Sequence, residues 1–473
     1  MRMTDARMYS RLLASDSDYD GRFFTGVMTT GIYCLPSCKA RKPKRESVRF
    51  FPTCEAAREA GLRPCHKCHP DDFARGADPV LESIETLVGE IREDSAKFVD
   101  ARSVVRRSGY GTTRAFELFR RHYHATPADV LQAARITKAR ALLLKGKDSV
   151  SDTAFAAGFE SLSTFHDNFR RHTGLTPATY RELPGLSHFE IALPRDFSLP
   201  HLRYALSRDG ESVSERLIGD DYATALTVGG KAILLRLRLA ADSIAVACPH
   251  GMAVGTHDVA MGLLGLGQDA AGFARLSKRL GFARLVAGRT GLRISQTPTV
   301  FDGLLWAVIG QQINFPFAGR LRRRLFELCG TPAGEGLIAA PSPQALAGIE
   351  PEELLPLQFS RQKARYLIAI ARMIADGKLN LDALRSLSAT RVERTLLAIR
   401  GLGPWSVNYL MMRSLGFADC SPLGDTGVTT GLQKLMHLEE RPDIDATRSL
   451  MTVFSPHRSL ATAHLWQINR SIP

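Results

Sequence analysis

The spacing of apolar and polar residues divides the chain into four stretches. The first, to about residue 70, shows no long helical period. Over 80–183 the pattern is that of amphipathic helices, with capping serines expected at Ser151 and Ser161. In the third stretch, short apolar or alternating runs predict strands at 223–228, 232–239 and 243–247. From residue 258 onward, helices punctuated by glycine and proline dominate.

Segments rich in helix breakers separate these stretches. The polar segment 71–79 (DDFARGADP) follows the first stretch, and Pro184 with Gly185 ends the second. A length of 473 residues suffices for about three domains of ordinary size. We therefore predict a multidomain, mainly α protein, with a small α/β domain first and an α+β domain before the last helical one. The predicted domain ranges are 1–72, 80–183, 188–295 and 296–473.

The charge of the chain indicates its partner. Lysine and arginine outnumber aspartate and glutamate by 62 to 48, a net charge of +14 that favours a polyanion such as nucleic acid. The excess is concentrated over 102–147, where eleven basic residues face only Glu117 and Asp129. No apolar run of about 18 residues occurs, and the first residues lack the apolar core of a signal peptide. We therefore expect a cytoplasmic protein without a membrane partner.

The eight cysteines are unevenly distributed, and four of them form two closely spaced pairs. Cys34 and Cys38 are separated by three residues, and Cys65 and Cys68 by two. Two paired thiolates on two turns supply the tetrahedral donor set that Zn²⁺ prefers. Spacing alone leaves open a purely structural zinc site. Cys54 lies outside this spacing and is expected in the core.

The residues around these cysteines add a specific resemblance. The segments 29–38 (TTGIYCLPSC) and 60–68 (AGLRPCHKC), with the phenylalanines at 50 and 51, resemble the metal-binding domain of the Ada methylation-response regulators. The resemblance runs from about residue 18 to 71. It implies that Cys34 accepts a methyl group from a DNA methylphosphotriester and that Arg41 contacts DNA. One position differs, because Leu35 stands where the family commonly has arginine.

The second stretch contains two helix-turn-helix patterns. In the later one, a Gly-Phe turn at 158–159 separates a short helix from a second helix over 161–172, on which Ser163, Thr164 and His166 lie away from the apolar face. The earlier one places Arg114 on a helix over 112–123. Together with the segment 169–177 (FRRHTGLTP), the pattern resembles the AraC-type activator domain. The resemblance implies that these four residues contact promoter DNA and that RNA polymerase is a further partner.

A third pattern lies near the C-terminus, in the segment 397–409 (LAIRGLGPWSVNY). Gly401 and Gly403 form a turn between two predicted helices, and the backbone N–H groups at the start of the second helix can hold a DNA phosphate. Asp425 follows twenty residues after Trp405. On sequence alone, Asp425 could be simply the N-cap of the next helix, although a cap and a catalytic carboxylate can coexist.

This hairpin with its following aspartate resembles the helix-hairpin-helix DNA glycosylases, and within them the AlkA alkyl-base branch, from about residue 189 to the end. The resemblance implies that Asp425 is the catalytic carboxylate. It also implies an aromatic pocket for a cationic base, formed by Tyr204, Tyr409 and Trp466. Gln312 stands where the family has an intercalating leucine, so we assign it the wedge position in DNA.

The predicted activity follows from these resemblances. Trp405 occupies the position at which lyase-type glycosylases carry a catalytic lysine, which predicts a monofunctional glycosylase. We expect a protein with Zn²⁺ that binds double-stranded DNA, both alkylated and promoter DNA. It would sense methylphosphotriesters, regulate repair genes and excise alkylated purines such as 3-methyladenine. Two alternatives stay open: a non-enzymatic regulator with a silent glycosylase fold, and a repair enzyme whose helix-turn-helix region only anchors it to DNA.

Overall fold

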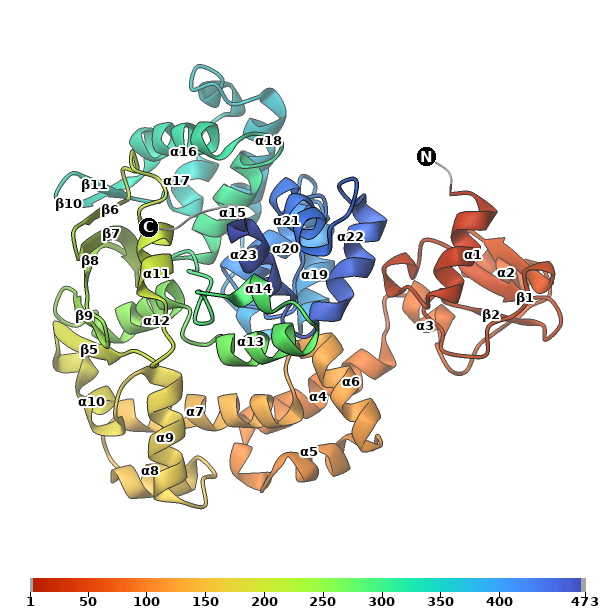
Figure 1. The fold of residues 1–473 in the computed structure, drawn as a ribbon, viewed down its shortest axis with the longest axis horizontal. Coiled ribbons are helices and arrows are strands. Elements are labelled where there is room, and N and C mark those ends of the chain that lie inside the picture. The colour runs from red at the N-terminus through yellow and green to blue at the C-terminus, as the bar shows by residue number, and fades with distance from the viewer. Residues whose placement is uncertain (1–2, 469–473) are drawn as a thin grey trace. The chain divides into compact units, whose positions relative to one another are not determined.

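The computed structural model describes residues 3–468, and the chain forms two compact units, Met1–Leu87 and Val88–Pro473 (Figure 1). The architecture is multidomain and mainly α, as predicted. Within residues 3–468, no helix combines the length and the apolar character needed to cross a membrane.

The first unit is a four-stranded sheet in the order β3-β1-β2-β4 with short helices around it. Its core is small, built mainly from apolar side chains such as Phe24, Tyr33 and Leu62. Its elements are α1 (Asp5–Leu13), β1 (Phe24–Val27), β2 (Ile32–Cys34), β3 (Val48–Phe51), α2 (Cys54–Glu59), β4 (Arg63–Pro64) and α3 (Pro70–Ala74).

The second unit begins with a helical region that contains the two predicted helix-turn-helix patterns. Its helices are α4 (Pro79–Glu93), which spans the boundary of the units, α5 (Ala101–Ser108), α6 (Thr112–Tyr123), α7 (Pro127–Lys145), α8 (Val150–Ala156), α9 (Leu162–Thr173) and α10 (Pro177–Glu182). Helix α7 connects the two helix-turn-helix patterns. Thr126 and Asp129 fix its start, because each side chain accepts a hydrogen bond from the other's backbone N–H.

One of the two predicted helix caps is wrong. Ser161 caps α9, since its Oγ accepts from the Thr164 N–H at 3.4 Å. Ser151, however, lies inside α8, and the cap is Ser149, whose Oγ accepts from the Asp152 N–H at 3.0 Å. The acidic residue three positions after Ser149 favours this earlier start.

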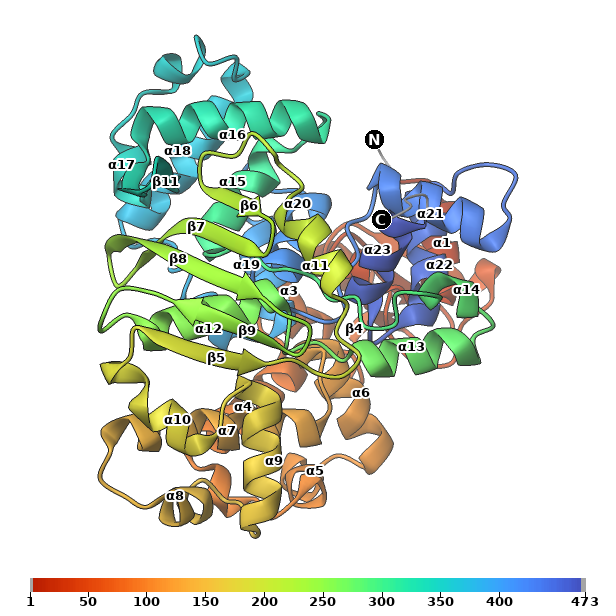
Figure 2. The ribbon, with the colours of Figure 1, turned by 60° about the vertical axis from the view of Figure 1, so that its left-hand side comes forward.

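A five-stranded antiparallel sheet follows, in the order β5-β9-β8-β7-β6 (Figure 2). The three predicted strands correspond to β7, β8 and β9, whereas the edge strands β5 and β6 had no separate prediction. The elements are β5 (His188–Ala192), α11 (Leu199–Leu206), β6 (Glu215–Ile218), β7 (Asp221–Val228), β8 (Lys231–Leu239), β9 (Ser243–Ala247) and α12 (Ala253–Leu264).

This sheet shares one apolar core with the helix-turn-helix region. Phe165 and Phe169 of α9 belong to the same buried cluster as Ile191 of β5 and Leu235 of β8. The Ala192 N–H also donates to the Gly174 carbonyl at 3.1 Å, just after α9. Shared burial of this kind makes the two parts pack as one body.

The remaining helices form a second, larger core. Between α16 and α17 a short hairpin, which the sequence pattern did not predict, pairs β10 with β11. The elements are α13 (Ala270–Arg279), α14 (Ala283–Val286), α15 (Val300–Ile309), α16 (Phe315–Cys329), β10 (Thr331–Gly334), β11 (Leu337–Ala339), α17 (Pro343–Ala347), α18 (Arg361–Ala375), α19 (Ala389–Leu397), α20 (Pro404–Arg413), α21 (Thr426–Met436), α22 (Ile444–Met451) and α23 (Arg458–Gln467).

Candidate zinc centre and candidate active site

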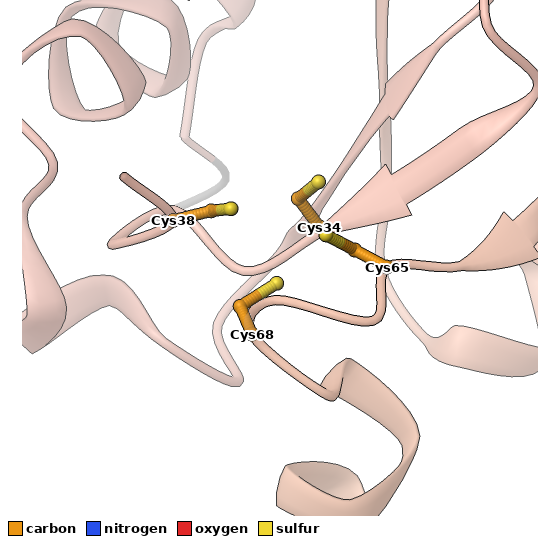
Figure 3. Close-up of side chains that lie close together, drawn as sticks. All are labelled: Cys34, Cys38, Cys65 and Cys68. Atoms are coloured by element: carbon orange, nitrogen blue, oxygen red, sulfur yellow. The ribbon is translucent and has the colours of Figure 1, made fainter. Parts of the chain in front are cut away.

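The two cysteine pairs meet because strands β2 and β4 lie parallel to each other. Cys34 is the last residue of β2, and Cys65 directly follows β4, with its N–H donating to the Tyr33 carbonyl at 3.0 Å. The sulfur atoms of Cys34, Cys38, Cys65 and Cys68 all lie within 4.8 Å of one another (Figure 3). The sequence-predicted donor set is therefore assembled.

The surroundings of the four sulfurs suit a metal ion. Backbone N–H groups donate to two of them, from Leu35 to Cys68 Sγ and from Lys67 to Cys65 Sγ, both at 3.4 Å. Asp20 holds the turn between the first pair by accepting from the N–H and the hydroxyl of Ser37, at 3.0 and 2.6 Å. Four thiolates around Zn²⁺, with Zn–S bonds of about 2.3 Å, place their sulfurs about 3.8 Å apart, which this arrangement accommodates.

The residues next to this cluster have distinct environments. Cys54 is a core residue, as predicted: it is 1% exposed, its thiol donates to the Pro70 carbonyl, and burial raises its pKa to about 12. Lys42 donates to the Cys38 carbonyl at 2.7 Å, and Arg41 is exposed. Among the cluster cysteines, Cys34 is 7% exposed, while Cys68 is half-buried. The positive side chain of Lys42 thus lies beside the sulfur cluster.

The predicted DNA-facing residues of the helix-turn-helix region lie at the surface. Ser163, Thr164 and His166 are exposed on α9, while Phe165 of the same helix is fully buried. Arg114 is half-exposed on α6, where it forms an ion pair with Glu117 at 3.2 Å. Helix α9 therefore presents a polar face, whereas Arg114 must leave an acidic neighbour before it can pair with a phosphate.

Asp425 accepts three hydrogen bonds where α20 and α21 approach α23. Its Oδ1 accepts from the Val428 N–H at 3.0 Å, so it caps α21, and also from the Trp466 indole N–H at 2.9 Å. Its Oδ2 accepts from the Trp405 indole N–H at 3.1 Å. One side chain therefore caps α21 and also accepts hydrogen bonds from two indoles.

Trp405 is a site residue that the sequence reasoning did not select. The resemblance treats it only as the residue at the lysine position of lyase-type glycosylases, whereas in the structure its indole N–H donates to Asp425 Oδ2. A half-buried indole N–H needs a hydrogen-bond acceptor. This requirement is the signal from which Trp405 could have been recognised as a partner of Asp425.

The two tryptophans that donate to this carboxylate both pack against Tyr409. Trp405 and Tyr409 stack with centroids 5.2 Å apart at 19°, and Tyr409 and Trp466 lie 6.5 Å apart at 47°. The structure thus brings two of the three predicted pocket residues together. Tyr204 is half-buried on α11, one turn after His201. Burial lowers the pKa of His464, on the same helix α23 as Trp466, to about 3.

The predicted hairpin joins α19 to α20, and its two glycines differ in their surroundings. Gly401 has a φ of +102°, and a Cβ added there would lie 2.5 Å from the Tyr366 ring. Gly403 is the N-cap of α20 with a φ of −95°, and an added Cβ would meet nothing within 4 Å. Gly401 is thus required by the fold, whereas the space beside Gly403 is open to a DNA backbone.

The loop at 310–314 approaches this hairpin. The Gln311 amide donates to the Gly401 carbonyl at 2.7 Å and to the Ser406 hydroxyl at 2.9 Å. Sequence reasoning did not assign this role to Gln311. Its neighbour Gln312 is exposed and has a left-handed backbone with a φ of 55°. An exposed side chain on a loop tied to the hairpin suits the predicted wedge, which stays a prediction.

The two glycines should respond differently to alanine. We expect Gly401→Ala to lower the free energy of unfolding by about 2 kcal/mol, because of its left-handed backbone and the Tyr366 ring. Gly403→Ala should change it by less than about 0.5 kcal/mol. Urea unfolding followed by tryptophan fluorescence measures this part of the chain, since its tryptophans are Trp306, Trp405 and Trp466. Equal losses in both variants would contradict the assigned difference.

Comparison with known proteins finds three family models in order along the chain. The metal binding domain of Ada matches residues 7–71, a helix-turn-helix domain matches 104–183, and the HhH-GPD superfamily of base excision DNA repair proteins matches 305–456. Each model covers one of the sites described above.

Individual relatives follow the same division. A Mycobacterium tuberculosis protein named probable bifunctional transcriptional activator/DNA repair enzyme AlkA is 29% identical, over 97% of this chain and 95% of its own length. The Bacillus subtilis DNA-3-methyladenine glycosylase is 32% identical over 38% of this chain and 60% of its own. The structure of 3-methyladenine DNA-glycosylase from Archaeoglobus fulgidus covers 60% of this chain and 99% of its own, with a TM-score of 0.52 and 18% identity. This last likeness shows the fold.

Proposed function

Because the chain joins an Ada-type zinc-binding domain, an AraC-type helix-turn-helix domain and a helix-hairpin-helix glycosylase domain in that order, we propose that it responds to alkylated DNA and excises alkylated purines such as 3-methyladenine. The observation that carries the proposal is the Asp425 carboxylate, which accepts from the indole N–H groups of Trp405 and Trp466 beside the ring of Tyr409. A fold kept only to hold DNA would not require this arrangement.

The excision step uses the charge of the damaged base. An alkylated purine is cationic, so the faces of Tyr409 and Trp466 favour it once it is flipped out of the duplex. The glycosidic bond breaks, its electron pair leaves with the base, and the negative charge of Asp425 stabilises the positive sugar. Water then bonds to the sugar carbon and loses its proton to solvent. Because Trp405 replaces a lysine, no Schiff base forms, and the product is an abasic site.

The N-terminal unit would carry out a separate methyl transfer. The sulfur of Cys34 attacks the methyl carbon of a DNA methylphosphotriester, a carbon–oxygen bond breaks, and the phosphate leaves as an ordinary diester anion. When zinc is bound to Cys34, Cys38, Cys65 and Cys68, it keeps these sulfurs deprotonated, with a cluster charge of about −2. The transfer is stoichiometric, since the sulfur keeps the methyl group.

Methylation would also change how strongly the unit binds DNA. Methylation removes one negative charge from the cluster. The positive charges of Lys39, Arg41 and Lys42 do not change. Repulsion of the phosphate backbone falls, so DNA affinity rises and remains sensitive to salt. The exposed residues Ser163, Thr164 and His166 of α9 would then read promoter DNA, with RNA polymerase as the partner in activation.

The proposal is tested with the full chain and a methylated duplex. We expect released methylated purines and abasic sites in equal amounts, and specific binding of promoter DNA over random duplex in a separate assay. Binding without release would contradict the glycosylase and favour a regulator with a silent fold. Release without promoter preference would contradict the regulator and favour a repair enzyme anchored to DNA.

A further inference from the structure

The two halves of the helix-turn-helix region end their second helices with related sequences. Residues 121–127 read RHYHATP, and residues 171–177 read RHTGLTP. Both helices end in a left-handed residue, with a φ of 67° at Gly174 and 53° at His124. Glycine is the usual residue there, whereas histidine adopts this conformation at a cost. His124 therefore needs a compensating contact.

That contact lies in the glycosylase part. The Asp419 N–H donates to His124 Nδ1 at 3.2 Å, and the imidazole packs edge-on against the Phe417 ring, with centroids 5.5 Å apart at 77°. Burial lowers the pKa of His124 to about 4, so the ring is neutral at pH 7 and Nδ1 can accept a hydrogen bond. Nearby, His122 Nδ1 lies 2.9 Å from the hydroxyl of Thr390 on α19, against which α6 packs.

The segment that His124 contacts leads directly to the candidate catalytic carboxylate. Phe417 and Asp419 belong to the connection between α20 and α21, which ends at Asp425. Further along the same connection, the Cys420 N–H donates to the Ser459 hydroxyl and the Ser421 N–H donates to the Asn408 amide oxygen, both at 3.1 Å. The connection is therefore held at successive residues.

A second route reaches Asp425 through α23. The carboxylate of Asp419 accepts from Arg458 Nε at 2.8 Å and from its Nη2 at 3.0 Å. Burial would raise the pKa of Asp419, but Arg458 lowers it below its usual range. Arg458 is the first residue of α23, and Trp466 near the end of that helix donates to Asp425. Asp419 thus links the helix-turn-helix region to the two segments that lead to Asp425, the 417–425 connection and α23.

We infer that His124 is a positioning residue for excision: the first helix-turn-helix half braces the 417–425 connection and thereby holds Asp425 in place. The inference rests on the proposed glycosylase function. It gives the helix-turn-helix region a role within the repair reaction in addition to binding promoter DNA. The shared core and the ion pair between Arg140 of α7 and Asp258 of α12 keep the same region attached on its other side.

The test compares His124→Gly with His124→Asn in the full chain. Glycine removes the imidazole but suits the left-handed backbone, so the end of α6 stays folded. Asparagine tolerates the same backbone, and its amide oxygen can accept from the Asp419 N–H. We expect His124→Gly to lower the single-turnover rate of base release about 10-fold with unchanged affinity for abasic duplex, and His124→Asn to restore the rate to within about 3-fold.

Hydrogen–deuterium exchange gives a readout that does not depend on activity. Amides over 417–425 should exchange faster in His124→Gly than in the native chain, and at the native rate in His124→Asn. Native release and exchange in His124→Gly would overturn the inference, as would equal rate losses in both variants. Absence of release from the native chain would instead contradict the proposed function, and exchange would then decide whether His124 braces the connection.

Discussion

The Asp425→Asn variant should release alkylated purines about 10³-fold more slowly than the native chain. The substitution removes the negative charge that opposes the positive sugar while keeping the shape of the side chain. The amide oxygen can still accept from the Val428 N–H, so the cap of α21 and the fold survive. The measurement is single-turnover release of methylated purines from duplex DNA, with abasic sites counted in the same samples.

A comparison with Trp405→Phe separates the effect of the Asp425 charge from the effect of its orientation. Trp405→Phe keeps a ring against Tyr409 but loses the N–H that donates to Asp425 Oδ2. We expect it to slow release by only about 10-fold, because the charge remains. Tryptophan fluorescence and thermal unfolding would show that both variants are folded. Native rates in Asp425→Asn would exclude this carboxylate from the reaction.

Cys34→Ser should abolish methyl transfer from a methylphosphotriester to the protein. A serine hydroxyl is not ionised at neutral pH and is a much weaker nucleophile than a thiolate. Mass spectrometry of peptides from the reacted chain locates the methyl group, and zinc content is measured alongside. In the native chain, methylation at Cys34 should also raise the affinity for promoter DNA, with a smaller gain at high salt.

Cys54→Ala is the matched control for this variant. Cys54 lies in the same unit but outside the sulfur cluster, and its thiol donates to the Pro70 carbonyl. Methyl transfer should therefore proceed at the native level. Transfer that persists in Cys34→Ser would assign the acceptor to another sulfur, first of all to Cys68, which is the least buried of the four.

Much of the candidate chemistry could be predicted from local sequence. The cysteines expected to bind zinc form two pairs, and the members of each pair lie within one short turn. Their spacing alone therefore predicts a four-sulfur donor set. The hairpin glycines and the cap of α21 are local as well, since each depends on residues a few positions away. The bounds predicted for the helices at 112–123 and 161–172 agree to within one residue with α6 and α9, whereas the cap expected at Ser151 lies at Ser149.

The arrangement around Asp425 was not accessible in this way. Trp405 and Trp466, which hold its two oxygens, lie 20 and 41 residues away in the chain. Gln311 reaches the hairpin across 90 residues of the chain. The edge strands β5 and β6 also depend on partners elsewhere in the sheet. The sequence pattern shows which polar groups and strands need a hydrogen-bonding partner. It does not specify which distant segment supplies that partner.

By itself, the sequence of this protein determined the order of its domains, the four zinc ligands, the hairpin and the aspartate that follows it. Only the tertiary structure decided that two indoles orient that aspartate and that the imidazole of His124 reaches the Asp419 amide 295 residues away. The physical reason is the separation along the chain between the residues that interact. Turns, caps and chelating pairs are set by a few successive residues, whereas a buried hydrogen bond between distant segments depends on how whole cores pack against each other.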